Sequence, residues 1–419
     1  MKNHIIHTQN VQLQTGKFDD AFELQNRVSN LLKNGVMDKL ESLFDEVAPN
    51  ENILRFDKLE LNLGNINKQN LETEFSQKLI EQLSRVLLEM KNDDFETGSN
   101  QSSHQQSLLD SLIFFLIHGY MPWYHVVKPF AEWEKDLLGS FSKNEWDAII
   151  KELKNNDDAI RRLVMQFSSP FLETILFEIH AALNKQKIQS FLERFNNKFD
   201  VIKKNYSNLF WMKTIKSALD TASENDFTIT LLKSIDKGDK SLEKNQESID
   251  QPEGDFFIPN CGIVILHPFL LMFFRELGLV EENTFKSDEK KQRAVLLLHY
   301  LATGETEMPE FNLTLCKLLC GVDIEEPVPN FIELTELEIN ESANLLKAVT
   351  QHWVPLHNTS AEGLRSSFFS REGKITPTEN GWILKVEQKA IDILLDKLPW
   401  GIGTIKLPWM KKTLNVEWC

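Results

Sequence analysis

Residues 381–410 read GWILKVEQKAIDILLDKLPWGIGTIKLPWM, and the sequence LNVEW follows at residues 414–418. Within 382–387, and again within 414–418, every second side chain is apolar and would share one face of an extended chain. An alternation with a period of two is typical of β-strands that bury one face. We therefore predict that the chain ends in a small antiparallel sheet.

The stretch LPWGIGTIKLPWM, at residues 398–410, lies between these two predicted strands. Trp400 and Trp409 each follow a proline, which cannot donate to a strand ladder, so the stretch suits an edge or bulged strand. Two interpretations of these tryptophans remain open. They cap the core of the domain, or they anchor a partner, because tryptophan is enriched among interface hot spots. Together with Trp418 they are the candidate partner contacts.

Most of the last third has the spacing of amphipathic helices, with apolar residues three and four positions apart. Helices are predicted at residues 268–277, 291–302, 309–320, 335–353 and 361–370. Together with the terminal strands, these helices form a predicted C-terminal mixed domain over residues 255–419.

The middle of the chain, residues 108–235, is helical in pattern and rich in aromatic residues. Its prolines and glycines, which interrupt helices, predict a compact central bundle of several helices rather than one long helix. They are Pro122, Pro129, Gly139 and Pro170. Two polar stretches bound this region, at residues 92–107 and 236–254, and we interpret both as linkers.

The first 91 residues predict a β-α-β-α unit. Alternating residues near 4–14 and 53–63 indicate strands, and helical spacing follows each of them. A change of phase near Asp57 indicates a β-bulge, and two strands alone need further strands or a partner for stability. The whole chain is thus predicted to be an α+β protein that is predominantly α-helical.

Composition limits the classes of function. The 419 residues include 62 acidic and 46 basic side chains, a formal charge of −16 that disfavours nucleic acid as a partner. No window approaches the roughly 18 apolar residues of a membrane span, and no signal peptide is evident, so we expect a cytoplasmic protein. Four cysteines in so long a chain suit reduced thiols rather than a disulfide framework.

The common catalytic and phosphate-binding motifs do not occur in the sequence. One alternative is a zinc-dependent or thiol enzyme built on residues of the usual zinc-ligand types, Cys261, His267, His299, Cys316 and Cys320. Two of these cysteines lie among leucines in LTLCKLLC, which favours small buried apolar side chains instead. We therefore predict no catalytic residue, no metal and no cofactor.

Several blocks of the last third resemble the contractile injection system tape measure family. They lie at residues 262–280, 293–322, 352–375, 381–410 and 416–418. Near the start of the chain, LRFDKLELNLGNI at residues 54–66 resembles the N-terminal region of the same family. Because the blocks cover most of the last 160 or so residues, the likeness is far more specific than a single short motif.

The resemblance implies a structural component of a phage-tail-like particle, which has an inner tube, a contractile sheath, a baseplate and a spike. Its expected partners are inner tube, baseplate or spike proteins, and it is expected to stay in the cytoplasm or enter the assembled particle. A tape measure limits polymerisation of the tube. As one helix, the roughly 130 residues of the middle region would span about 190 Å, and a compact bundle is several times shorter.

This difference leaves a second interpretation within the same particle, namely a compact assembly chaperone or terminal adaptor. A free-standing peptide-binding module is a further alternative, and it predicts a stable monomer with an exposed apolar groove.

Overall fold

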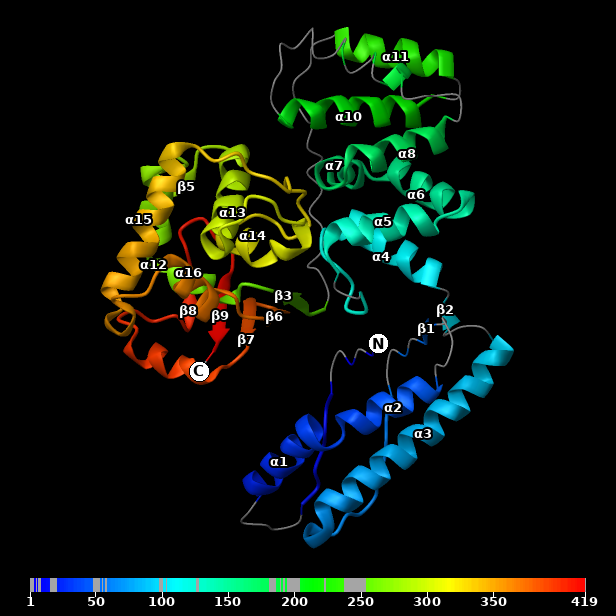
Figure 1. Cartoon of the computed structure of the whole chain (residues 1–419), viewed down its shortest axis with the longest axis vertical. Coiled ribbons are helices and arrows are strands. Elements are labelled where there is room, and N and C mark those ends of the chain that lie inside the picture. Colours follow the sequence, from blue (N-terminus) through cyan, green and yellow to red (C-terminus); the bar gives the residue numbers. More distant parts are fainter. Residues whose placement is uncertain are drawn as a thin grey trace. The chain divides into compact units, whose positions relative to one another are not determined.

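The computed structural model describes residues 4, 6, 9–15, 21–47, 53–54, 56, 59–97, 101–102, 104–125, 128–180, 186–188, 190, 193, 204–221, 224–236 and 254–418. The chain divides into two compact units, Met1–Asp110 and Ser111–Cys419. It is predominantly helical, with a small mixed sheet in its last third, which confirms the predicted fold class (Figure 1). No helix of the described residues is long and apolar enough to cross a bilayer.

The first unit is built around helices that share one apolar core. Its elements are α1 (Ala21–Asn30), the π-helical turn η1 (Leu31–Gly35), α2 (Met37–Val47), β1 (Ile53–Leu54), η2 (Lys68–Asn70), α3 (Leu71–Thr97) and β2 (Gln101–Ser102). Leu40, Leu43 and Val47 recur at helical spacing on α2 and are buried. They share a core with residues of α3 such as Phe75 and Leu83.

The two strands predicted in this unit are not observed as predicted. Described residues 9–15 belong to no strand, and β1 contains only Ile53 and Leu54, which pair with β2. The alternation at Leu59, Leu61 and Leu63 does place these side chains against the helical core. Alternation fixes which side chains face a core, but a strand also needs a neighbouring backbone. The bulge predicted near Asp57 lies outside the described residues.

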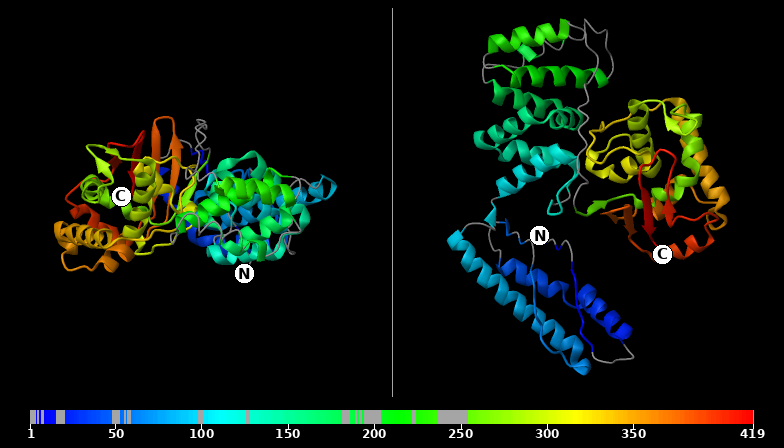
Figure 2. Two further views of the ribbon diagram at one scale, coloured as in Figure 1. Left: turned by 90° about the horizontal axis from the view of Figure 1, so that it is seen from above. Right: turned by 180° about the vertical axis from the view of Figure 1, so that it is seen from behind.

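The helices from α4 to α11 lie in successive layers, which we call the helical stack (Figures 1 and 2). They are α4 (His104–His118), α5 (Phe130–Ser140), α6 (Lys143–Asn155), α7 (Asp157–Gln166), α8 (Ser169–Ile179), α10 (Lys204–Leu219) and α11 (Glu224–Asp236). Local signals set several boundaries. Ser142 and Glu145 form a capping box at the start of α6, and the Asn156 side chain accepts from the Ala159 amide at the start of α7.

The remaining residues form a mixed region, residues 254–418, which we call the C-terminal region. Its helices are η3 (Cys261–Leu266), α12 (His267–Glu276), α13 (Asp288–Thr303), η4 (Glu310–Asn312), α14 (Thr314–Cys320), α15 (Glu336–His352), η5 (Val354–Leu356), α16 (Ala361–Leu364), η6 (Arg365–Phe369) and η7 (Ala390–Lys397). Its strands are β3 (Phe256–Ile258), β4 (Val280–Glu281), β5 (Thr284–Phe285), β6 (Gly373–Thr378), β7 (Gly381–Val386), β8 (Thr404–Ile405) and β9 (Thr413–Glu417).

The five-stranded sheet has the order β3-β6-β7-β9-β8. The prediction of a purely antiparallel sheet is wrong in one pair, because β9 runs parallel to β7, with Leu384 beside Val416. The connection between these strands is long enough for a crossover, since it contains η7 and β8. Ile375, Leu384 and Leu414 are fully buried, so the sheet packs one face against the helices of the C-terminal region.

Candidate functional site

The predicted contact residues Trp400 and Trp409 are both partly buried, and the indole N–H of each donates a hydrogen bond to a backbone carbonyl. Trp400 Nε1 donates to the Ile265 carbonyl at 2.9 Å, and its ring lies edge-on to Phe269 at 5.0 Å. Trp409 Nε1 donates to the Leu319 carbonyl at 2.7 Å. Both rings therefore pack against the core of the C-terminal region and keep part of their surface accessible.

Trp418 differs from these two tryptophans, because its side chain is 2% exposed. Trp418 Nε1 donates to Asp392 Oδ2 at 3.1 Å, and Asp392 Oδ1 accepts from Arg371 Nη2 at 2.8 Å. Asp392 Oδ2 also accepts from the Lys389 amide at 2.8 Å. The structure thus places Trp418 in a buried polar cluster that fixes the end of β9.

The cysteines and histidines of the zinc or thiol alternative are not gathered into one site. Cys261, Cys316 and Cys320 are buried free thiols, and burial raises the pKa of each, that of Cys316 to about 12. Burial lowers the pKa of His299 to about 4, and His267 Nδ1 bonds to a backbone carbonyl. Within the described residues, no group of three or more His, Cys, Asp or Glu side chains could hold a metal.

A buried charge network, which sequence reasoning missed, lies where α7 meets the C-terminal region. Arg162 and Glu310 are fully buried, and Lys317 is 1% exposed. Arg162 Nε donates to Glu310 Oε2 at 3.0 Å, and Lys317 Nζ donates to Glu310 Oε1 at 2.6 Å. Burial lowers the pKa of Lys317, although Glu310 favours its charged form.

Backbone carbonyls satisfy the remaining donors of Arg162. Its Nη1 donates to the carbonyls of Leu116 and Ile117 at the end of α4, the second at 2.9 Å. Its Nη2 donates to the Glu325 carbonyl. Because the last carbonyls of a helix have no partner within it, one guanidinium here completes α4 and joins it to residues 310–325.

Gln166, one helical turn after Arg162, extends the network. Its Nε2 donates to the Val328 carbonyl at 2.8 Å, and its Oε1 accepts from the Glu310 amide at 2.9 Å. His118 Nδ1 lies 2.6 Å from Glu325 Oε1. The sequence carried one signal for this network, since Lys317 is the single charged residue in the apolar helix LTLCKLLC.

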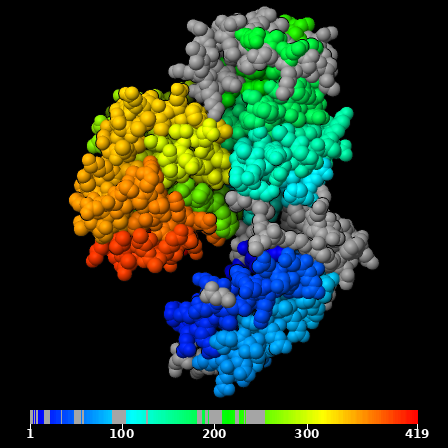
Figure 3. Space-filling view, viewed as in Figure 1, coloured from blue at the N-terminus to red at the C-terminus, as the bar shows by residue number. Residues whose placement is uncertain are grey.

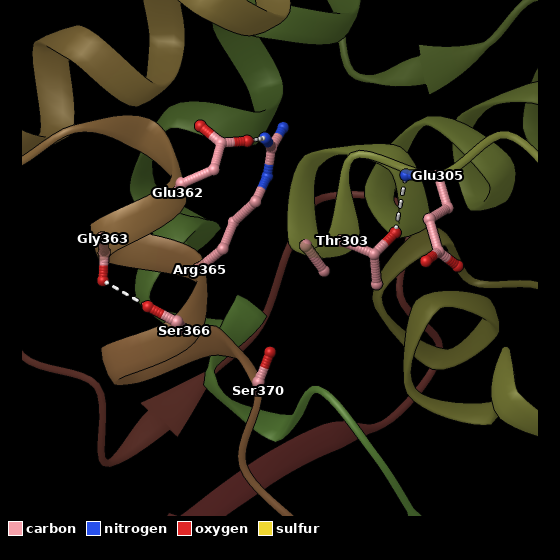
Figure 4. A pocket seen from close by; sticks show the side chains of 8 residues that line it. Thr303, Glu305, Glu362, Gly363, Arg365, Ser366 and Ser370 are labelled. Carbon is pink, nitrogen blue, oxygen red and sulfur yellow. Dashed lines mark hydrogen bonds and ion pairs between the residues drawn. The ribbon is translucent and has the colours of Figure 1, made fainter.

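A surface recess of about 480 Å³ lies between the end of α13 and the segment from α16 to η6 (Figure 4). Most of the residues that line it have polar side chains, among them Thr303, Glu305, Glu362, Arg365 and Ser366. Arg365 Nη1 donates to Glu362 Oε1 at 2.6 Å, so the charge of the guanidinium is already paired. The recess offers hydroxyl groups and carboxylates to a polar or basic group.

The described residues thus define a helix-rich protein whose candidate sites are anchored tryptophans, a polar recess and a buried charge network. The chain belongs to the contractile injection system tape measure protein family, whose sequence profile matches residues 3–251 and 232–418. This finding confirms the resemblance drawn from the sequence blocks. Searches among curated proteins and among solved structures found no match to the chain.

Proposed function

We propose that this chain is a structural and assembly protein that acts through protein contacts at the inner tube or baseplate to set or permit tube assembly. Family membership supports contacts with other parts of a contractile particle. The observation that carries the proposal is the anchoring of Trp400 and Trp409, whose indole N–H groups are already bonded. A ring held in place loses little side-chain freedom when a partner covers its exposed part.

The contact role is assigned to Trp400 and Trp409 and not to Trp418. Trp418 is 2% exposed, so a partner could reach it only if the domain opened. The partners we propose are inner tube, baseplate or spike proteins, met in the cytoplasm or within the particle. The burial of Cys261, Cys316 and Cys320 further supports a protein without catalytic thiols, because their raised pKa disfavours the thiolate.

The contact proposal is tested with Trp400→Leu and Trp409→Leu in the full chain. Each variant is first checked for a thermal midpoint close to wild type, and intact particles are then counted by electron microscopy. We expect far fewer particles at wild-type protein level. Val354→Ala is the matched control, because Val354 is an apolar side chain of the same region and is 78% exposed. Normal particle numbers with both tryptophan variants would contradict the proposal.

The helical stack bears on how the protein could measure length. Its helices are 10 to 16 residues long, as in α7 and α10, and they lie in layers (Figure 1). Packed helices are about 8–10 Å apart, so a layered ruler gains less than 1 Å per residue, against about 1.5 Å along a helix axis. This compactness favours the second candidate, an assembly chaperone or terminal adaptor that does not measure length.

Tube length distinguishes these candidates. Four extra copies of residues 204–236, which carry α10 and α11, add 132 residues. They would lengthen an extended helical ruler by about 200 Å and a layered ruler by about 65–80 Å. A chaperone or adaptor predicts no change. The control inserts 132 polar residues within 237–253. This insertion would lengthen the tube if the protein is an extended ruler, but not if it is a layered ruler or a chaperone or adaptor. Unchanged tubes in fully assembled particles with both insertions would exclude measurement by this region.

A further inference from the structure

The buried charge network joins parts of the chain that are far apart in sequence. Arg162 and Glu310 are 148 residues apart, and Gln166 and Val328 are 162 apart. The network therefore holds together the two ends of the segment 167–309. Residues inserted within this segment cannot move its ends apart while the network is intact.

The network is arranged so that the two parts can separate without stranding a buried charge. Glu310 and Lys317 belong to the same side and are paired at 2.6 Å, so this pair does not depend on Arg162. Arg162, on α7, would regain water in place of Glu310 and the Glu325 carbonyl. The free energy lost by removing two charges from water offsets most of the attraction between them in a buried ion pair. Replacing the Arg162–Glu310 pair by hydrated charges therefore changes the free energy little.

The aromatic contacts between the helical stack and the C-terminal region would also leave each side with packing partners of its own. Phe115 lies 5.8 Å from Phe311 across the boundary, but it also packs on Trp133 at 5.9 Å within the helical stack. Tyr120 lies 4.6 Å from Phe256, and Phe256 also packs on Trp382 within the C-terminal region. Each side therefore keeps aromatic packing of its own after separation.

We propose that Arg162, Glu310 and Lys317 form a latch that holds the helical stack closed on the C-terminal region in the free chain and opens in the assembled particle. In the open chain the α7 side and the residue-310 side of the latch are free to move apart, while residues 254–309 stay packed in the C-terminal region. Assembly contacts that favour the open form supply the driving force, because a partner shifts an equilibrium only by binding one state better. The closed latch stands on the geometry, whereas its opening in the particle rests on the proposed function.

The closed latch is tested by cutting the chain between its two parts. A specific protease site is placed within residues 237–253, the full chain is cut, and association of the two pieces is measured. We expect the wild-type pieces to stay together and Arg162→Met to weaken their association by at least about 100-fold, because the joined state would then bury Glu310 Oε2 and the Glu325 carbonyl without their donor. Arg161→Met is the matched control, since Arg161 is also buried on α7 but pairs with Asp158 in its own helix.

Two outcomes of the cutting experiment would overturn the latch. In one, the wild-type pieces separate as soon as the chain is cut. In the other, Arg162→Met and Arg161→Met weaken association equally. Neither outcome depends on the particle, so a failure here is distinguishable from a failure of the proposed function.

Opening is tested by distance measurement in the full chain. Spin labels are attached to Lys154→Cys on α6 and Glu379→Cys beside β7, with Cys419→Ser, while the three buried cysteines stay because their thiols are protonated and inaccessible. We expect one narrow distance distribution in the free protein and longer distances in purified particles. The same narrow distribution in particles that contain the labelled chain would overturn the opening step.

Discussion

Gly119 lies directly against Glu310, so that a Cβ atom on Gly119 would come within 2.5 Å of Glu310 Oε1. Its φ of +79° is in the left-handed region that side chains rarely adopt. We expect Gly119→Ala to lower the free energy of unfolding by about 1–3 kcal/mol, through backbone strain and displacement of the carboxylate. Urea unfolding measures the loss. Gly139→Ala is the control, because Gly139 lies in α5 with nothing within 4 Å of its Cβ position, and we expect it to stabilise by up to about 1 kcal/mol.

The charge network should respond differently to one substitution and to three. Glu310→Gln removes the carboxylate that Arg162 and Lys317 share, and we expect it to cost about 3–5 kcal/mol because two buried cations lose their partner. The triple variant Arg162→Met, Glu310→Leu, Lys317→Met removes every charge and should recover most of that loss. Urea unfolding of the three proteins checks this. A triple variant less stable than Glu310→Gln would contradict the role assigned to the charges.

Trp418 is expected to stabilise the C-terminal region through both packing and one hydrogen bond. Trp418→Ala should lower the free energy of unfolding by about 3–5 kcal/mol, as large buried aromatic side chains do. Trp418→Phe keeps a ring but removes the donor to Asp392, at a cost of about 1–3 kcal/mol. Chemical unfolding followed by tryptophan fluorescence compares the two. Equal losses for Ala and Phe would show that the hydrogen bond to Asp392 dominates instead.

Acid should destabilise the fold through His299. Burial lowers the pKa of His299 from 6.5 to about 4, so the unfolded chain binds a proton in this window that the folded chain does not. Stability from this group is complete above pH 6.5 and falls by up to about 1.4 kcal/mol per pH unit as pH drops towards 4. Urea unfolding between pH 7.5 and 4.5 should show a shallower decline for His299→Gln. An identical decline in both proteins would assign the acid sensitivity to other groups.

The charge network also predicts where the chain can be divided. Residues 111–419 retain Arg162 and Gln166 beside Glu310, so this piece should fold without residues 1–110. Residues 254–419 alone would expose the surface that Arg162 and Gln166 cover. We expect the longer piece to unfold cooperatively at a temperature at least several degrees above the shorter one. Scanning calorimetry on both pieces measures this difference.

Periodic patterns in the sequence predicted the helical character and the strands β7 and β9, because amphipathic spacing reports burial directly. The same argument misjudged the pairing of β9, because parallel and antiparallel neighbours bury their faces alike. In the first unit, Leu59 and Leu61 were predicted to lie in a strand; they face the core but lie in no strand. Alternation records which way side chains point, and it carries no information on the backbone partner.

The candidate site shows the same limit. The sequence at residues 398–410, where a proline precedes each tryptophan, identified Trp400 and Trp409, and their positions on the core still permit both interpretations. Arg162 was missed, because a lone arginine on a helix normally faces solvent and its partner Glu310 lies 148 residues away. Only the fold brings these side chains together. Lys317 within an apolar helix was the local sign that a buried carboxylate had to exist elsewhere.

The position of β9 also affects how the protein is made. In sequence, β9 follows the other four strands of its sheet, yet in space it lies between β7 and β8. During translation β3, β6 and β7 can pair as they emerge, whereas β8 has no neighbour to join until Thr413–Glu417 has left the ribosome. A nascent chain stopped before Thr413 therefore carries a split sheet with the apolar face around Leu384 incompletely covered, a natural target for chaperones and proteases. Only chains translated through β9 can complete the sheet, cover this apolar face and so avoid binding by chaperones and cleavage by proteases.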